Sequence, residues 1–187
     1  QPGYRAQQLG RWLYQSGCLS WEEMSNLPSS WRQQLAAEFD LSALEPVERL
    51  VSQDGTRKIL FQLRDGQSIE SVIIPMTGHV TFCLSTQVGC AMACRFCATA
   101  RGGLARNLVT GEILEQVLRL RADLDQNPFP DLPEPRYNIV FMGMGEPLDN
   151  WANLEPALSA LLCPAGMGLS KRRIQISTSG PASTSRT

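Results

Sequence analysis

Gln87-Val88-Gly89-Cys90-Ala91-Met92-Ala93-Cys94-Arg95-Phe96-Cys97-Ala98-Thr99 is the stretch that organises this chain, because three cysteines occur there at the spacing C-x-x-x-C-x-x-C. Thiols this dense indicate a metal site rather than disulfides if the protein works in a reducing compartment. Structural zinc takes four protein ligands, and iron–sulfur clusters are usually held by four cysteines. A set of three, Cys90, Cys94 and Cys97, leaves one coordination position open for a ligand from solution.

Two other interpretations of the three cysteines remain. A zinc site could be completed by Cys83 or by His79, which is the only histidine of the chain. The thiols could also be unrelated small apolar residues of a core, but such close spacing next to a glycine is rare by chance. The sequence favours an iron–sulfur cluster over both.

Composition sets outer limits on function. The chain has 187 residues, 43% hydrophobic and 19% charged, which is ordinary for a globular protein. The net charge of −1 lacks the basic excess of a nucleic-acid binder, so any contact with RNA must come from local patches. No apolar run reaches the length of a membrane span and no signal peptide opens the chain. We therefore expect a cytoplasmic protein that does not enter a membrane.

Residues 1–46 are predicted to form a small helical domain. Leu9, Trp12 and Leu13 share one helical face. Ser20-Trp21-Glu22-Glu23 has the form of a capping box, which predicts a helix start there. A further helix is expected from Ser30, after the break at Pro28.

Residues 47–78 are predicted to form a β-meander. Asp54-Gly55 and Asp65-Gly66 are hairpin-turn signals, and they bound strands at 58–63 and 68–74. Glu70 interrupts the otherwise apolar second strand. By alternation it points away from Ile69 and Ile73, which predicts a position on the solvent face.

Residues 79–187 alternate between strand and helix patterns, which predicts an α/β fold with right-handed crossovers and a parallel sheet. A continuous apolar run at 137–142 predicts a strand buried on both faces. The expected elements are strands at 80–85, 137–142 and 174–180 and helices from Thr110 to about Leu124 and from about Asn153 to Leu162.

Three motifs follow the three parallel strands, where α/β sheets bind their ligands: the cysteine stretch, Gly143-Met144-Gly145-Glu146-Pro147 and Ser177-Thr178-Ser179-Gly180. The second motif is no dinucleotide fingerprint, since no third glycine and helix follow it. Its glycines either let the backbone approach a ligand or only form a tight turn.

The assembled motifs resemble one branch of the radical S-adenosylmethionine (SAM) superfamily. This branch holds the RNA adenine-C2 methyltransferases of the RlmN type and their C8-methylating Cfr-type relatives. The resemblance covers about residues 2–180. It rests on Cys83-Leu84-Ser85-Thr86-Gln87-Val88-Gly89-Cys90, the three cysteines, Arg106-Asn107-Leu108, Phe141-Met142-Gly143-Met144-Gly145-Glu146-Pro147-Leu148, and Ser170-Lys171-Arg172-Arg173 before Ser177-Thr178-Ser179-Gly180.

The resemblance implies a [4Fe–4S] cluster on Cys90, Cys94 and Cys97, whose free iron chelates SAM and cleaves it to a 5′-deoxyadenosyl radical. It implies that Gly145, Glu146 and Ser177 bind SAM. Two further roles follow from the same resemblance. Glu70 matches the proton acceptor, and Cys83 matches one member of a cysteine pair that forms a disulfide during turnover.

The other cysteine of that pair, far toward the C-terminus in this family, carries the methyl group to the adenine. The implied substrates are an adenosine of 23S rRNA and tRNA, and the implied electron donor is a flavodoxin or a ferredoxin. The expected protein is a monomer.

The chain departs from the family pattern at its end. The family has a partial (βα)6 barrel, whereas only its N-terminal half is expected here, with residues 181–187 forming a polar tail. Cys18 and Cys163 are expected to be ordinary thiols rather than substitutes for the methyl-carrying cysteine. We therefore expect a truncated chain that does not methylate RNA by itself. The alternative is a non-catalytic iron–sulfur or zinc module that binds RNA.

Basic side chains near the motifs are candidates for phosphate contacts, although such groups are more often simply solvated. They are Arg101, Arg106, Lys171, Arg172 and Arg173, with Arg5, Arg11 and Arg32 in the helical region.

Overall fold

The computed structural model describes residues 3–132 and 136–180, so the predicted polar tail at 181–187 lies outside the described residues. One six-stranded sheet has the order β1-β2-β3-β4-β7-β8, and a second sheet pairs β5 with β6. The strands are β1 (Leu44–Val51), β2 (Arg57–Leu63), β3 (Ser68–Met76), β4 (His79–Cys83), β5 (Gln87–Gly89), β6 (Leu104–Asn107), β7 (Tyr137–Phe141) and β8 (Ile174–Ile176). The helices are α1 (Gly3–Gly10), η1 (Arg11–Gln15), α2 (Ser29–Glu38), η2 (Thr99–Gly102), α3 (Thr110–Gln126), η3 (Pro147–Asn150), α4 (Trp151–Leu162) and η4 (Lys171–Arg173).

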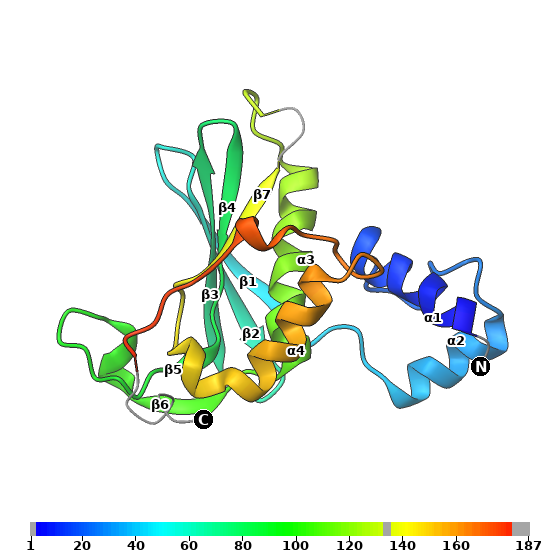
Figure 1. The fold of residues 1–187 in the computed structure, drawn as a ribbon, viewed down its shortest axis with the longest axis horizontal. Helices are drawn as coiled ribbons and strands as arrows, with labels where there is room; N and C mark the ends of the chain where they lie inside the picture. The colour runs from blue at the N-terminus through cyan, green and yellow to red at the C-terminus, as the bar shows by residue number, and fades with distance from the viewer. Residues whose placement is uncertain (1–2, 133–135, 181–187) are drawn as a thin grey trace.

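The predicted meander and the predicted barrel strands belong to one continuous sheet. Strands β1 to β4 pair antiparallel, whereas β4, β7 and β8 run parallel. Helices α3 and α4 make the crossovers between the parallel strands and lie on one side of the sheet (Figure 1). The predicted α/β fold is therefore confirmed, as a mixed sheet. The turns at Asp54-Gly55 and Asp65-Gly66 are also confirmed, since both glycines adopt positive φ.

The two faces of the sheet differ in what covers them. Side chains that point toward α3 and α4 are almost fully buried, among them Phe82 and Phe141. On β7 the alternate residues Asn138 and Val140 are only half-buried. The prediction that this strand is buried on both faces is therefore wrong for the described residues, because helices cover one face only. We call the other side the open face.

Helix α3 forms as its sequence predicts. Thr110 is its first residue, and the apolar stripe is buried at Ile113, Leu114, Val117, Leu118 and Leu124. The Thr110 side chain does not cap the helix, since its hydroxyl donates to the Asn153 carbonyl. The orphan N–H at the start of the helix is instead bonded by Glu112, whose carboxylate accepts from the Val109 N–H at 2.9 Å.

The N-terminal helices enclose a small core of their own around Cys18, Met24 and Leu27. Arg121 of α3 joins them to the sheet domain, because its guanidinium donates to the Tyr14 and Gln15 carbonyls. The helix predicted from the capping box at Ser20 is wrong: residues 21–23 form only a turn. The Ser20 hydroxyl donates to the Glu22 carboxylate, and Pro28 leaves too few residues for a stable helix.

Other predicted bounds shift by small amounts. Helix α2 starts at Ser29, helix α4 at Trp151, and β8 ends at Ile176 rather than continuing to Gly180. Within the described residues, no helix combines the length and apolar character that crossing a bilayer requires.

Candidate functional site

The cysteine stretch leaves the sheet at the carboxyl end of β4 and projects away from α3 and α4 (Figure 1). Its base is the small β5–β6 ladder, where Gln87 pairs with Asn107 and Val88 with Arg106. Gly89 is required at this base, because it has φ of 76° and an added Cβ would lie 2.0 Å from the Gly103 carbonyl oxygen. This ladder was not predicted, since three- and four-residue strands carry too little alternation to be recognised.

The three cysteines share this loop but are not drawn together. Among the described residues, no group of three or more His, Cys, Asp or Glu side chains is placed to hold a metal ion. The Met92 N–H points at the Cys90 sulfur at 3.5 Å, and the Cys94 thiol points at the Met92 carbonyl at 3.9 Å. The donor set itself fits an iron–sulfur cluster, because three thiols lie within eight residues of one loop.

Backbone amides also favour the ionised form of one of these thiols. A hydrogen bond from the Ala100 N–H, assisted by Thr99, holds the pKa of Cys97 below its usual value. A thiolate is the form that ligates a metal. His79 does not belong to this set: it begins β4, and the strand rise places it roughly 13 Å from Cys83 at the other end. The structure thus disfavours a zinc site completed by His79.

Gly143 and Gly145 bring the turn after β7 against the segment that leads into the cysteine loop. A Cβ on Gly143 would lie 2.7 Å from the Leu84 carbonyl carbon and oxygen, and one on Gly145 would lie 2.6 Å from the Gln87 side chain. Gly145 also has φ of 104°. The glycines therefore permit close approach between two backbone segments of the chain, a purpose that the sequence did not reveal.

Glu146 is the most constrained acidic side chain at this end of the sheet. It is 3% exposed, and its carboxylate accepts four hydrogen bonds. The donors are the Leu148 N–H at 3.0 Å, the Thr178 hydroxyl at 2.5 Å, and the N–H and hydroxyl of Ser179, both at 2.8 Å. Burial raises the pKa of Glu146, but these hydrogen bonds outweigh it and hold the pKa below the usual value. The side chain is therefore an anion at neutral pH.

Glu70 and Cys83 both lie on the open face of the sheet. Strands β3 and β4 pair Val72 with Cys83, and Glu70 lies two residues before Val72 on the same face of β3. The predicted solvent-facing position of Glu70 is confirmed: its side chain is 43% exposed and pairs with Lys58 at 2.8 Å. Burial raises the pKa of the Cys83 thiol, partly offset by a backbone hydrogen bond from Met142.

Ser177 follows the end of β8 and is exposed. Its neighbours Thr178 and Ser179 reach Glu146, so the third motif meets the second at the carboxyl edge of the sheet, as the parallel topology predicts. The structure thus gathers Glu146, Ser177 and Cys83 at one edge. It places all the predicted site residues at this edge or on the open face beside it, and their binding and catalytic roles remain predictions.

Sequence reasoning missed the buried polar residues that join these motifs. Gln87 accepts from the Glu146 N–H at 2.7 Å and donates to Asn107. Asn150 donates to the Thr86 and Leu108 carbonyls at 2.7 and 2.8 Å. A signal was present in α3, where the fully buried Gln116 interrupts an apolar stripe.

Among the basic candidates, Arg101 is exposed in η2, directly after the cysteine stretch, whereas Arg106 and residues 171–173 are placed differently. Arg106 is bound by two carboxylates: it donates bidentately to Glu112 and also to Asp65, and these partners raise its pKa. Residues 171–173 precede β8 and so lie at the amino end of the parallel strands, away from the cysteine loop. Neither position favours a phosphate contact at the site itself.

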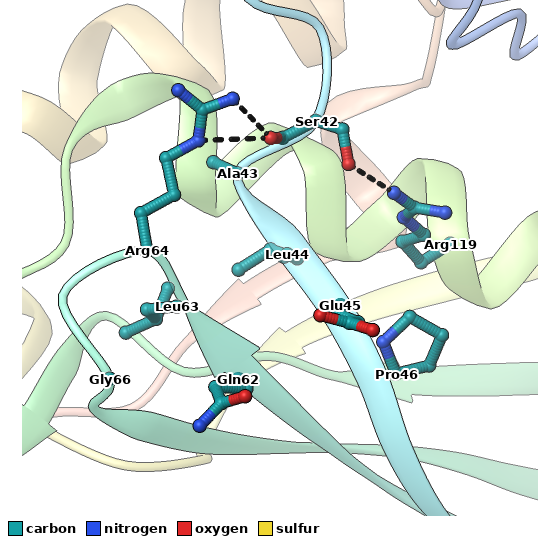
Figure 2. A pocket seen from close by; sticks show the side chains of 10 residues that line it. All are labelled: Ser42, Ala43, Leu44, Glu45, Pro46, Gln62, Leu63, Arg64, Gly66 and Arg119. Carbon is teal, nitrogen blue, oxygen red and sulfur yellow. Dashed lines mark hydrogen bonds between the residues drawn. The ribbon is translucent and has the colours of Figure 1, made fainter.

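A hollow of about 560 Å³ lies between β1, the β2–β3 hairpin and α3 (Figure 2). Arg64 donates to the Ser42 carbonyl and forms an ion pair with Asp40, whereas Arg119 donates to the Ser42 hydroxyl and to Glu115. None of the predicted site residues lines this hollow. The guanidinium groups of Arg64 and Arg119 bind residues 40–44 and so hold this segment against the sheet domain.

Comparison with known proteins agrees with this arrangement. Residues 84–186, more than half of the chain, match the radical SAM superfamily. The chain belongs to the radical SAM superfamily. Residues 1–41 match the ribosomal RNA large subunit methyltransferase N-terminal domain, which agrees with the resemblance to the RlmN-type branch. The radical SAM superfamily implies a [4Fe–4S] cluster and SAM.

The radical SAM chain is similar to relatives that are about twice as long. It is 45% identical to the dual-specificity RNA methyltransferase RlmN of a Nitratiruptor species, over 97% of this chain and 53% of the relative. It is 48% identical to the protein of that name from Geobacter sulfurreducens, over 95% of this chain and 46% of the relative. A crystal structure of a radical SAM methyltransferase from Sphaerobacter thermophilus superposes with a TM-score of 0.87 at 39% identity, covering 97% of this chain and 52% of that one. The chain therefore spans about half the length of these relatives.

Proposed function

We propose that this chain is the cluster- and SAM-binding half of an RNA methyltransferase that modifies C2 of an adenosine in 23S rRNA and in tRNA. The observation that carries the proposal is the meeting of three motifs at one edge of the sheet. The cysteine loop follows β4, Glu146 follows β7, and Ser177 follows β8. The relatives named as dual-specificity RNA methyltransferases support the reaction class.

In this proposal Cys90, Cys94 and Cys97 would hold a [4Fe–4S] cluster, which supplies the electron that cleaves SAM when it is bound. The loop must close for this, since its thiols stand apart. The lowered pKa of Cys97 favours metal binding, and Gly89 lets the base of the loop pack tightly. An external donor such as a flavodoxin or a ferredoxin would deliver the electron.

Glu146 would bind the amino group of SAM, with Gly145 and Ser177 beside it. A buried anion suits an ammonium ligand, because opposite charges attract strongly where water is excluded. Four donors already occupy the acceptor positions of its two oxygens, so the ligand must replace at least one of them. Thr178 and Ser179 are the donors that a shift of the chain after β8 would release.

Glu70 and Cys83 would act on the open face, where RNA has access. The Glu70 carboxylate would accept a proton from the adenine ring, and its ion pair with Lys58 is exposed enough to exchange easily. Cys83 would attack a cysteine-bound adduct to release the product through a disulfide. The raised pKa of the Cys83 thiol keeps it protonated, and so unreactive, in the resting protein.

Reconstitution without air tests the proposal. The protein is incubated with iron and sulfide, reduced with dithionite and mixed with SAM, and 5′-deoxyadenosine is measured. Cleavage of SAM that is lost in a Cys94→Ala variant supports the proposal. Binding of one zinc ion without SAM cleavage supports instead the non-catalytic module. The expectation that these 187 residues alone do not methylate RNA remains a prediction, checked by assaying 23S rRNA and tRNA for 2-methyladenosine.

A further inference from the structure

Ser85 joins three elements of the proposed site although no motif assigns it a role. It lies between Cys83 and the cysteine loop and is fully buried. Its hydroxyl donates to the Glu70 carbonyl at 2.6 Å and accepts from the Met144 N–H at 2.9 Å. One side chain thus fixes the backbone of the predicted proton acceptor and that of the turn leading to Glu146.

Gln116 of α3 holds Ser85 itself in place. Its amide pairs with the Ser85 peptide in both directions: Oε1 accepts from the Ser85 N–H at 2.8 Å, and Nε2 donates to the Ser85 carbonyl at 2.9 Å. Oε1 also accepts from the Ser71 hydroxyl at 2.8 Å, and Nε2 donates to the Glu112 carbonyl at 3.3 Å. Gln116 is fully buried, and its full hydrogen-bonding capacity is used.

Burying these polar groups costs free energy that apolar side chains would not cost, so their use in this core indicates that they fix the positions of the backbone segments they bind. A buried amide is tolerated only when its partners are all present, and an apolar residue at position 116 would extend the stripe of α3. The partners of Ser85 are backbone groups on both sides of Cys83, so the network sets the relative positions of β3, β4 and the turn after β7.

We propose that Ser85 and Gln116 are positioning residues, which fix Glu70 and Cys83 relative to the turn before Glu146 and hold that turn in the geometry that SAM binding requires. The inference rests on the proposed function for the ligand, but the hydrogen-bond network exists without it. Loss of the Ser85 hydroxyl leaves the Glu70 carbonyl and the Met144 N–H without their partner. The turn that carries Glu146 would then move relative to the cysteine loop.

Ser71 provides a matched control. It is also fully buried, and its hydroxyl also bonds to Gln116, but its side chain makes no hydrogen bond to Ser85 or to the turn. Ser85→Ala and Ser71→Ala each remove one buried hydroxyl. A role in stability alone predicts similar effects of the two variants, whereas a positioning role predicts that they differ.

The test uses two measurements on the wild type and both variants. Hydrogen exchange at the Met144 amide is followed first, because it needs neither cluster nor SAM. We expect Ser85→Ala to accelerate it about tenfold or more and Ser71→Ala to leave it near wild type, since one amide loses its acceptor. SAM affinity is then measured on the anaerobically reconstituted proteins. We expect Ser85→Ala to weaken it about five- to tenfold, the equivalent of one hydrogen bond, while Ser71→Ala binds SAM like the wild type.

The inference is overturned if the Met144 amide exchanges equally in all three proteins, or if both variants weaken SAM binding to the same extent. If the wild type binds no SAM at all, the proposed function fails. The exchange data then decide alone whether Ser85 positions the turn.

Discussion

Replacing Glu146 by glutamine tests the most constrained charge of the site. The substitution keeps the size of the side chain but turns one acceptor oxygen into an N–H donor group, so two of the four donors lose their acceptor. Hydroxyls can rotate to another partner, whereas the N–H groups of Leu148 and Ser179 cannot. Since hydrogen bonds to charged groups contribute about 1.5–3 kcal/mol each, we expect Glu146→Gln to lower the free energy of unfolding by about 2–4 kcal/mol at pH 7.

The effect should depend on pH in a definite direction. The folded pKa of Glu146 lies below its reference value of 4.5, so its contribution is complete above that pH and is lost as the pH falls through the folded pKa. The glutamine variant lacks this titration. The stability difference between wild type and variant should therefore narrow below about pH 4.5.

Urea unfolding followed by circular dichroism at pH 7 and at pH 3.5 measures both effects. Glu155→Gln is the control, because Glu155 is exposed on α4, and a change within about 0.5 kcal/mol is expected there. A loss below about 0.5 kcal/mol for Glu146→Gln at pH 7, or a difference that does not change with pH, would refute the reasoning about the four donors.

Two further measurements test the close packing of the turn after β7 and the burial of the Cys83 thiol. Gly143→Ala places a Cβ 2.7 Å from the Leu84 backbone and should lower the melting temperature by several degrees. The control is Gly111→Ala, whose Cβ has open space, so the melting temperature should stay unchanged or rise. Equal melting temperatures of the two variants would show that the turn is not packed as described. Because burial raises the pKa of Cys83 above 9.0, its alkylation by iodoacetamide should be slower at pH 8 than that of the exposed Cys163, as read by peptide mass spectrometry. Faster alkylation of Cys83 would contradict the burial argument.

The elements that the sequence predicted well are those with long periodic patterns. Helix α3 has an apolar stripe over many residues, and the hairpins have Asp-Gly turns whose glycines require positive φ. The short capping box at Ser20 failed because cap chemistry without room for two turns does not make a helix. Local signals thus predict an element only where enough chain follows them.

The prediction that the three motifs lie at one edge of the sheet succeeded for a different reason. Parallel strands bring their carboxyl ends together, so motifs after β4, β7 and β8 meet whatever their sequence separation. What the sequence could not show is the set of contacts between motifs. Gln116 and Ser85 are separated by 31 positions, and nothing in the spacing of either residue reveals that they pair.

The same limit explains the glycines of the turn. A glycine beside a predicted site can face a ligand or another backbone, and both need the absence of a Cβ. In this fold Gly143 and Gly145 face residues 84–87 of the chain. Their contribution to SAM binding is therefore proposed through the placement of Glu146.

Electron paramagnetic resonance on the anaerobically reconstituted and reduced protein tests the central claim most directly. The account predicts the signal of a reduced [4Fe–4S] cluster that changes when SAM is added, because the three cysteines leave one iron free to bind it. A protein that instead holds one zinc ion, or a cluster whose signal is unaffected by SAM, would contradict it.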